Sequence, residues 1–167
     1  MNRQRWALVS VSAAVVLPLA GLFWFEGALQ DRRSRQPEVG TVFPAVPGLG
    51  AGEHLPPSPG RMRVVAFARA GCGSCDRTIT ELRPLATERD FDLIAVVAQA
   101  TTATTAQGDG RYHEIADPDS SISHGFGVIH VPVVFLLDEN SRVQAVVTGE
   151  RTESRWRSLL GRPVDAH

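Results

Sequence analysis

Two cysteines, Cys72 and Cys75, are separated by only two residues and lie between segments of different character. Residues 64–68 (VVAFA) form an apolar run that is typical of a strand, and residues 76–89 have the apolar spacing of a helix. A helix that follows a cysteine pair directs the positive end of its dipole toward the first sulfur, which favours the thiolate. Because the thiolate is the form that attacks disulfides, this arrangement predicts a reactive dithiol.

Two other roles for a cysteine pair fit the sequence less well. A structural disulfide stabilises a protein mainly by closing a long loop, and a two-residue loop gains little in this way. A structural zinc site needs four ligands, and the chain has no second C-x-x-C and no H-x3-H. We therefore prefer a redox pair over a metal-binding pair or two incidental cysteines.

The N-terminal region contains an uncharged apolar run at residues 6–25. A helix of about 20 residues, rising about 1.5 Å per residue, spans the roughly 30 Å of hydrocarbon in a bilayer. Trp6, Trp24 and Phe25 lie at its ends, where aromatic side chains favour the membrane interface. A cleaved signal peptide is the alternative, but the run is long and residues 26–28 (EGA) make a poor cleavage site. We expect an uncleaved anchor in the lipid bilayer.

The orientation of this anchor follows from the redox chemistry rather than from the charges. Arginines flank the run on both sides, so the positive-inside rule does not decide between the two orientations. Disulfides persist mainly outside the cytosol, and a dithiol that works on them is expected there. We therefore expect a single-pass protein of the cell membrane with an extracytoplasmic C-terminal domain.

The chain divides into an anchor (1–25), a Pro/Gly-rich spacer and domain-leading segment (26–60) and a domain (61–167). The spacer is expected to lie over the domain rather than to build it, because such segments are extended and poor in hydrogen bonds. Residues 40–167 carry 12 arginines against 15 acidic residues and no basic stripe, which argues against nucleic-acid binding. The domain is long enough for one modest core.

Within 61–167, strand-like and helix-like segments alternate, which predicts an α/β fold with a mixed sheet flanked by helices. The expected elements are strands at 64–68, 91–98, 133–137 and 143–147, helices at 76–89 and 119–126, a loop at 99–110, and a final helix capped by Thr152 and ended by Gly161 and Pro163.

Two blocks of sequence, 67–75 (FARAGCGSC) and 127–138 (GVIHVPVVFLLD), resemble the thioredoxin superfamily. The resemblance implies a thioredoxin-like fold in which a cis peptide bond precedes Pro132 and this proline faces the cysteine pair. With its leading segment, the chain is most similar to the TlpA-like membrane-anchored thioredoxins of cytochrome c maturation and the methylamine dehydrogenase accessory proteins. This similarity implies a thiol-disulfide oxidoreductase without a cofactor. It would reduce disulfides of partner proteins and receive its electrons from a membrane electron donor.

The resemblance also implies roles for individual residues. Cys72 would be the nucleophile and Cys75 the resolving thiol, and the backbone of Val131 would pair with a substrate strand. Pro132 would keep a competing donor or metal away from the sulfurs. Ser74, if it is more than a solvated serine at a helix start, would donate a hydrogen bond to the thiolate.

Three positions depart from thioredoxin itself. Gly71 stands where a tryptophan usually precedes the first cysteine, Ser74 stands where proline is frequent, and Ala66 stands where thioredoxin has a buried acid. Gly71 and Ser74 are expected to bind substrate together with Val131, whereas Cys72, Cys75 and Pro132 are the expected catalytic residues. The departures argue against efficient general thioredoxin-type reduction and leave the superfamily assignment unchanged.

A second hypothesis is a copper-binding metallochaperone of the Sco type, which shares the anchor and the fold. Cys72, Cys75 and His130 would then be the ligands, because cysteine suits Cu(I). That family, however, spaces its cysteines by three residues and lacks the proline. A third hypothesis, a non-catalytic interaction module, would require an inert dithiol.

Overall fold

The computed structural model describes residues 36–47, 58, 60–100 and 111–161. The anchor expected at 6–25, most of the expected spacer and most of the loop expected at 99–110 lie outside these residues. In the described part of the chain, no helix combines the length and the apolar character needed to cross a membrane.

The described elements alternate as the sequence predicts, with one strand in addition. They are β1 (Arg63–Arg69), α2 (Gly73–Arg89), β2 (Asp92–Ala98), β3 (Tyr112–Asp117), α3 (Ser121–Gly125), β4 (Val133–Leu137), β5 (Val143–Thr148) and α4 (Glu153–Leu160). Thr152 is the N-cap of α4 by position, but its side chain makes no capping hydrogen bond. Gly161 ends this helix as expected, and Pro163 lies beyond the described residues.

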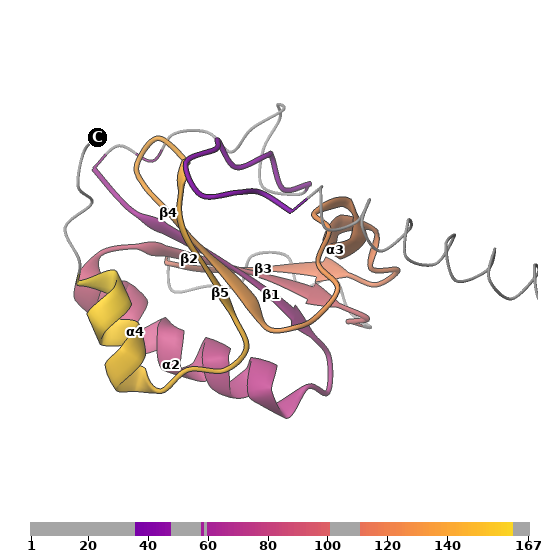
Figure 1. Cartoon of the computed structure of the whole chain (residues 1–167). Helices are drawn as coiled ribbons and strands as arrows, with labels where there is room; N and C mark the ends of the chain where they lie inside the picture. The colour runs from indigo at the N-terminus through magenta and orange to yellow at the C-terminus, as the bar shows by residue number, and fades with distance from the viewer. Residues whose placement is uncertain (1–35, 48–57, 59, 101–110, 162–167) are drawn as a thin grey trace, which may run out of the picture.

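The strands form one five-stranded sheet in the order β3-β2-β1-β4-β5 (Figure 1). The pairs β1–β2 and β2–β3 are parallel, whereas β1–β4 and β4–β5 are antiparallel, so the predicted mixed sheet is confirmed. Because β1 and β4 run in opposite directions, with Phe67 opposite Val133, the end of β1 and the start of β4 lie at the same edge of the sheet.

Strand β3 is the element that the sequence pattern did not predict. It lies at an edge of the sheet and has the sequence YHEIAD, in which only the first and last residues, Tyr112 and Asp117, are buried. An edge strand need not bury a full face, so it can lack the apolar alternation by which strands are recognised.

The two faces of the sheet carry separate hydrophobic clusters. Along β1, Val64 and Ala66 belong to a cluster that includes Leu82 of α2 and Trp156 of α4. Val65 and Phe67 alternate with them along the strand and face the other way. They pack in a second cluster with Phe126 and Val128, which follow α3. Helices α2 and α4 therefore cover one face of the sheet, while α3 lies on the other (Figure 1).

The expectation that the spacer only lies over the domain is wrong for its described part. Phe43 and Val46 are fully buried in the second cluster, and the Phe43 ring centroid lies 5.0 Å from those of Phe126 and Phe135. The backbone joins as well, since the Gly40 N–H donates to the Val143 carbonyl at 2.7 Å. Two large apolar side chains suffice to anchor a segment that shows no periodic pattern.

Candidate active site

The cysteine pair follows a tight turn at the end of β1. Gly71 in this turn has φ +73°, in the left-handed region that is strained for residues with a side chain. The turn is fixed by two backbone hydrogen bonds, from the Ala70 N–H to the Ala98 carbonyl at 2.9 Å and from the Cys72 N–H to the Arg69 carbonyl at 3.2 Å. The backbone conformation gives a physical reason for a glycine at the position where the family usually has tryptophan.

Helix α2 begins at Gly73, three residues before its predicted start, and Cys72 is its N-cap. The Cys72 carbonyl accepts from the N–H groups of Cys75 at 2.9 Å and Asp76 at 3.0 Å. The Cys72 Sγ also accepts from the Cys75 N–H at 3.3 Å. The predicted position of the first sulfur, at the positive end of a helix dipole, is therefore confirmed.

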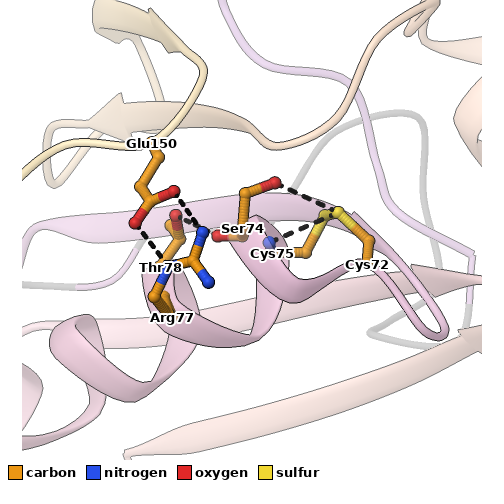
Figure 2. The surroundings of a disulfide bond; sticks show 6 residues. All are labelled: Cys72, Ser74, Cys75, Arg77, Thr78 and Glu150. Atoms are coloured by element: carbon orange, nitrogen blue, oxygen red, sulfur yellow. Dashed lines mark hydrogen bonds and ion pairs between the residues drawn. A yellow bond between two sulfur atoms is a disulfide. The ribbon is translucent and has the colours of Figure 1, made fainter.

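Cys72 and Cys75 form a disulfide, with their Cα atoms 5.2 Å apart (Figure 2). Cys75 is fully buried, whereas Cys72 is partly exposed. The Ser74 Oγ lies 3.3 Å from the Cys72 Sγ, and the Thr78 hydroxyl donates to the Ser74 carbonyl at 2.9 Å. The two cysteines thus differ in access, and a hydroxyl lies within reach of the more accessible sulfur.

The peptide bond between Val131 and Pro132 is cis, as the resemblance implied. Pro132 is buried and directly precedes β4, so the sheet places it at the edge where β1 leads to the cysteines. Its carbonyl accepts a hydrogen bond of 2.8 Å from the N–H of Gly149. Val131 is half-buried. The loop before β4 is therefore held by the loop that follows β5.

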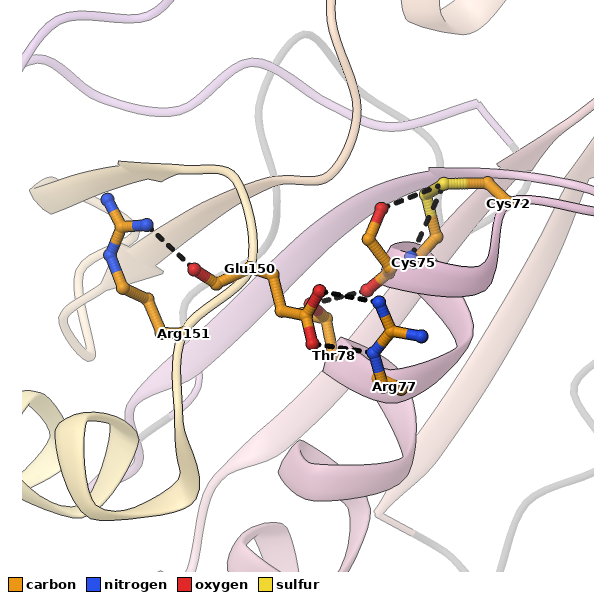
Figure 3. A network of polar contacts seen from close by, with 7 residues as sticks. Cys72, Cys75, Arg77, Thr78, Glu150 and Arg151 are labelled. Carbon is orange, nitrogen blue, oxygen red and sulfur yellow. Dashed lines mark hydrogen bonds and ion pairs between the residues drawn. A yellow bond between two sulfur atoms is a disulfide. The ribbon is translucent and has the colours of Figure 1, made fainter.

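An ion pair that the sequence did not reveal lies one helical turn from the disulfide (Figure 3). Arg77 donates from Nε to Glu150 Oε1 at 2.6 Å and from Nη2 to Glu150 Oε2 at 2.8 Å. These hydrogen bonds raise the pKa of Arg77 and lower the pKa of Glu150. With its pKa lowered, Glu150 keeps its charge, and so its partner, to a lower pH than an ordinary glutamate does.

Residues 59–160 of this chain match the Redoxin family, which is more than half of its length. The chain belongs to the Redoxin family. Together with the cysteine pair at the start of α2, this membership makes the protein a thioredoxin-like thiol-disulfide oxidoreductase. The resemblance inferred from the two sequence blocks is thereby confirmed.

Many solved structures share the fold of this Redoxin-family protein, and two of them illustrate it. One is a secreted Mycobacterium tuberculosis disulfide oxidoreductase homologous to E. coli DsbE, 14% identical, covering 76% of this chain and 96% of that chain at a TM-score of 0.52. The other is a thioredoxin-family thiol:disulfide interchange protein of Chlorobium tepidum, 17% identical, covering 75% and 94% at a TM-score of 0.53. A search of curated proteins found no match.

The structure gives no support for a copper site in this Redoxin-family protein. His130 is exposed, and the described residues contain no group of three histidine, cysteine or acidic side chains placed to hold a metal ion.

Ala66, at the position of thioredoxin's buried acid, lies in the first core cluster and is 1% exposed.

A buried carboxylate does occur on the opposite face of the sheet. Asp117, at the end of β3, is 1% exposed and accepts from the N–H groups of Ile122 at 3.0 Å and Ser123 at 2.8 Å and from the Ser123 hydroxyl at 2.7 Å. It therefore holds the start of α3, the helix that leads toward Pro132. The cluster of Asp, Pro and Ser at 117–121 is a turn and cap signal that could have indicated such a role.

We expect Asp117→Ala to lower the free energy of unfolding by about 2 kcal/mol, because buried donors lose their acceptor. Asp119→Ala is the matched control, since this exposed carboxylate accepts from the Ser121 N–H at 3.1 Å near the same helix. Its cost should be clearly smaller. Urea unfolding of the two variants would measure the difference, and equal losses would contradict the role given to Asp117.

Proposed function

We propose that this protein is a membrane-tethered, extracytoplasmic oxidoreductase that reduces disulfides of partner proteins. The observation that supports this most directly is the asymmetry of the dithiol. Cys72 is partly exposed at the N-terminus of α2, whereas Cys75 is fully buried one turn inside. One sulfur can therefore meet a partner while the other is kept for a second step.

In the proposed reaction, the Cys72 thiolate attacks one sulfur of the partner's disulfide. The disulfide bond of the partner breaks, a mixed disulfide forms, and the first partner thiolate leaves and takes up a proton. Cys75 then loses its proton and attacks the Cys72 sulfur, which releases the second partner thiolate. Two electrons pass from the protein to the partner, and the protein is left with the Cys72–Cys75 disulfide. A membrane-bound dithiol donor would reduce it again.

The surroundings of the cysteines suit this reaction. Ser74 Oγ, at 3.3 Å from Cys72 Sγ, can donate a hydrogen bond to the thiolate. Gly71 presents no side chain in front of the pair, and nothing lies within 4 Å of the position that a Cβ would take there. The backbone of Val131 would bind an extended substrate segment, and Pro132, which lacks an N–H, adds no competing donor.

The apolar run at 6–25 would tether the domain, and the disulfide chemistry would place the domain outside the cytoplasm. A secreted protein shares the fold, which is in keeping with this location. The direction of electron flow is taken from the resemblance to TlpA-like reductants.

The reduction potential of the full chain in detergent tests the direction. Known dithiols range from about −270 mV for strong reductants to about −120 mV for strong oxidants. We expect equilibration with glutathione or dithiothreitol buffers to give a reduction potential in the more negative, reducing half of this range. A potential near the oxidising end would overturn the reductant role.

Labelling of intact cells with a membrane-impermeant maleimide, after mild reduction, would test the location, since a cytoplasmic domain would stay unlabelled.

A further inference from the structure

The ion pair between Arg77 and Glu150 connects two parts of the candidate site that are distant in sequence. Arg77 lies on α2, two residues after Cys75, and Glu150 lies in the loop between β5 and α4. Both oxygens of the carboxylate accept from the guanidinium, at 2.6 and 2.8 Å. Such a bidentate pair fixes orientation as well as distance.

The loop that carries Glu150 is in turn attached to Pro132. The N–H of Gly149 donates to the Pro132 carbonyl at 2.8 Å, and Gly149 takes the left-handed φ of +80°. On the other side, Arg151 donates from Nη1 to the Glu150 carbonyl at 2.8 Å (Figure 3). The Glu150 side chain is therefore bound to Arg77 on α2. The adjacent residue, Gly149, is hydrogen-bonded to the loop before β4.

Arg77 also reaches the segment between the two cysteines. Its Nη1 lies 3.6 Å from the position that a Cβ would take on Gly73, the residue directly after Cys72. The guanidinium thus lies near Gly73 and is hydrogen-bonded to Glu150, which Figure 2 shows beside the first turns of α2. Two sets of hydrogen bonds and one peptide bond therefore link Arg77 through Glu150 and Gly149 to Pro132.

The exposure of this pair speaks against a role in stability. The side chains of Arg77 and Glu150 are 61% and 38% exposed, and exposed ion pairs contribute little to folding. The two side chains also carry opposite charges, so the pair as a whole adds no net charge to the site. What remains is geometry: the pair fixes the distance between the helix that carries Cys72 and the loop that carries Pro132.

We propose that Arg77 and Glu150 are positioning residues for protein substrates, which hold the Pro132 loop at the distance from Cys72 that a bound polypeptide strand requires. The inference rests on the proposed roles of Cys72 and Pro132 in the oxidoreductase reaction. A small reagent needs only the Cys72 sulfur, whereas a protein disulfide must also lie along the loop. Loss of the pair should therefore affect the two kinds of reaction differently.

The test compares Arg77→Gln, Glu150→Gln and the charge swap Arg77→Glu/Glu150→Arg in the full chain in detergent. Reduction of insulin disulfides, with dithiothreitol regenerating the Cys72–Cys75 dithiol, measures the reaction with a protein substrate. Alkylation of Cys72 in the reduced protein by iodoacetamide, at a pH where Cys72 is fully ionised, measures the reaction with a small reagent. We expect kcat/KM for insulin to fall about threefold to fivefold in both single variants, because an exposed pair contributes only modest free energy while misplacement of reacting groups lowers the rate. The alkylation rate should stay within about 1.3-fold of the wild-type rate, and the swap should regain most of the insulin activity.

The control is Arg157→Gln, which breaks a similar exposed pair in which Arg157 on α4 contacts Glu88 and Glu153. Because that pair lies away from the cysteines, insulin reduction should stay at the wild-type rate. Hydrogen exchange adds a second measurement, since the Gly149 amide should exchange faster in the Arg77 and Glu150 variants.

Two results would overturn the positioning role. One is insulin reduction at the wild-type rate in both single variants, and the other is an equal loss of insulin reduction and alkylation. If the wild-type protein oxidises reduced insulin chains instead of reducing insulin, the proposed direction fails, but the same variants still test the positioning role in that reaction. Mixed disulfides with a polypeptide form in both directions, so the pair should matter in either.

Discussion

Replacing Cys72 by serine should abolish reduction of protein disulfides, whereas replacing Cys75 should trap the protein on its partner. Cys72 is the N-cap of α2 and is partly exposed, so we expect the helix dipole to favour its thiolate and a partner disulfide to reach it. Cys75 is fully buried, so we do not expect it to make the first attack. In Cys72→Ser no mixed disulfide can form, and in Cys75→Ser none can be resolved.

Non-reducing gel electrophoresis of cells expressing each full-length variant would measure this difference. Cys75→Ser should accumulate high-mass adducts that disappear on reduction with dithiothreitol, and the captured partners could be identified by mass spectrometry. Cys72→Ser should show none, and its insulin reduction should fall to the rate without enzyme. If both variants trap partners equally, the assignment of the nucleophile is wrong. Ser74→Ala, which keeps both sulfurs, serves as the control for changes near the pair and should form no stable adduct.

Replacing Phe43 by alanine should cost about 3–5 kcal/mol of the free energy of unfolding, as is typical of a buried phenylalanine. Phe43 is fully buried and packs against Phe126 and Phe135, with ring centroids 5.0 Å away in both cases. Its loss leaves a cavity between the N-terminal segment and the sheet. The free energy of unfolding of a small domain is only about 5–15 kcal/mol, so a large fraction of the variant molecules would be unfolded at raised temperature.

The informative control is Val39→Ala in the same segment. Val39 is 63% exposed, and such a surface change should alter the free energy of unfolding by no more than about 0.5 kcal/mol. Denaturant unfolding followed by circular dichroism would measure both variants. Equal stability of the two variants would contradict the finding that this segment, which precedes the residues 59–160 that match the Redoxin family, belongs to the core.

Several features of the site could be predicted from local sequence because they depend on neighbouring residues. The strand, the cysteine pair and the helix follow one another within 63–89, and a helix start imposes its dipole on whatever residue caps it. The hairpin of β4 and β5 follows from two apolar runs joined by a short polar turn. The cis bond before Pro132 required the family resemblance, since trans is the usual state of an X-Pro bond.

Other features could not be predicted because they depend on the order of strands and on packing. Strand β3 lacks alternation, and its pairing with β2 identifies it as a strand. The Pro/Gly-rich composition around Phe43 indicated an extended segment and gave no sign that two of its side chains would be buried. Asp117 has the local signal of a cap, but its burial follows from the packing of α3 against the sheet.

Composition and local pattern alone predicted the chemistry of this protein: a dithiol at a helix start, in a small α/β domain that follows an apolar run at residues 6–25. Only the tertiary structure decided which side chains surround that dithiol. Arg77 and Glu150 are 73 residues apart in the chain, and they meet because the sheet brings the loop after β5 beside the first turns of α2. Local pattern reports the preferences of neighbouring residues, whereas such a contact exists only once the whole sheet has assembled.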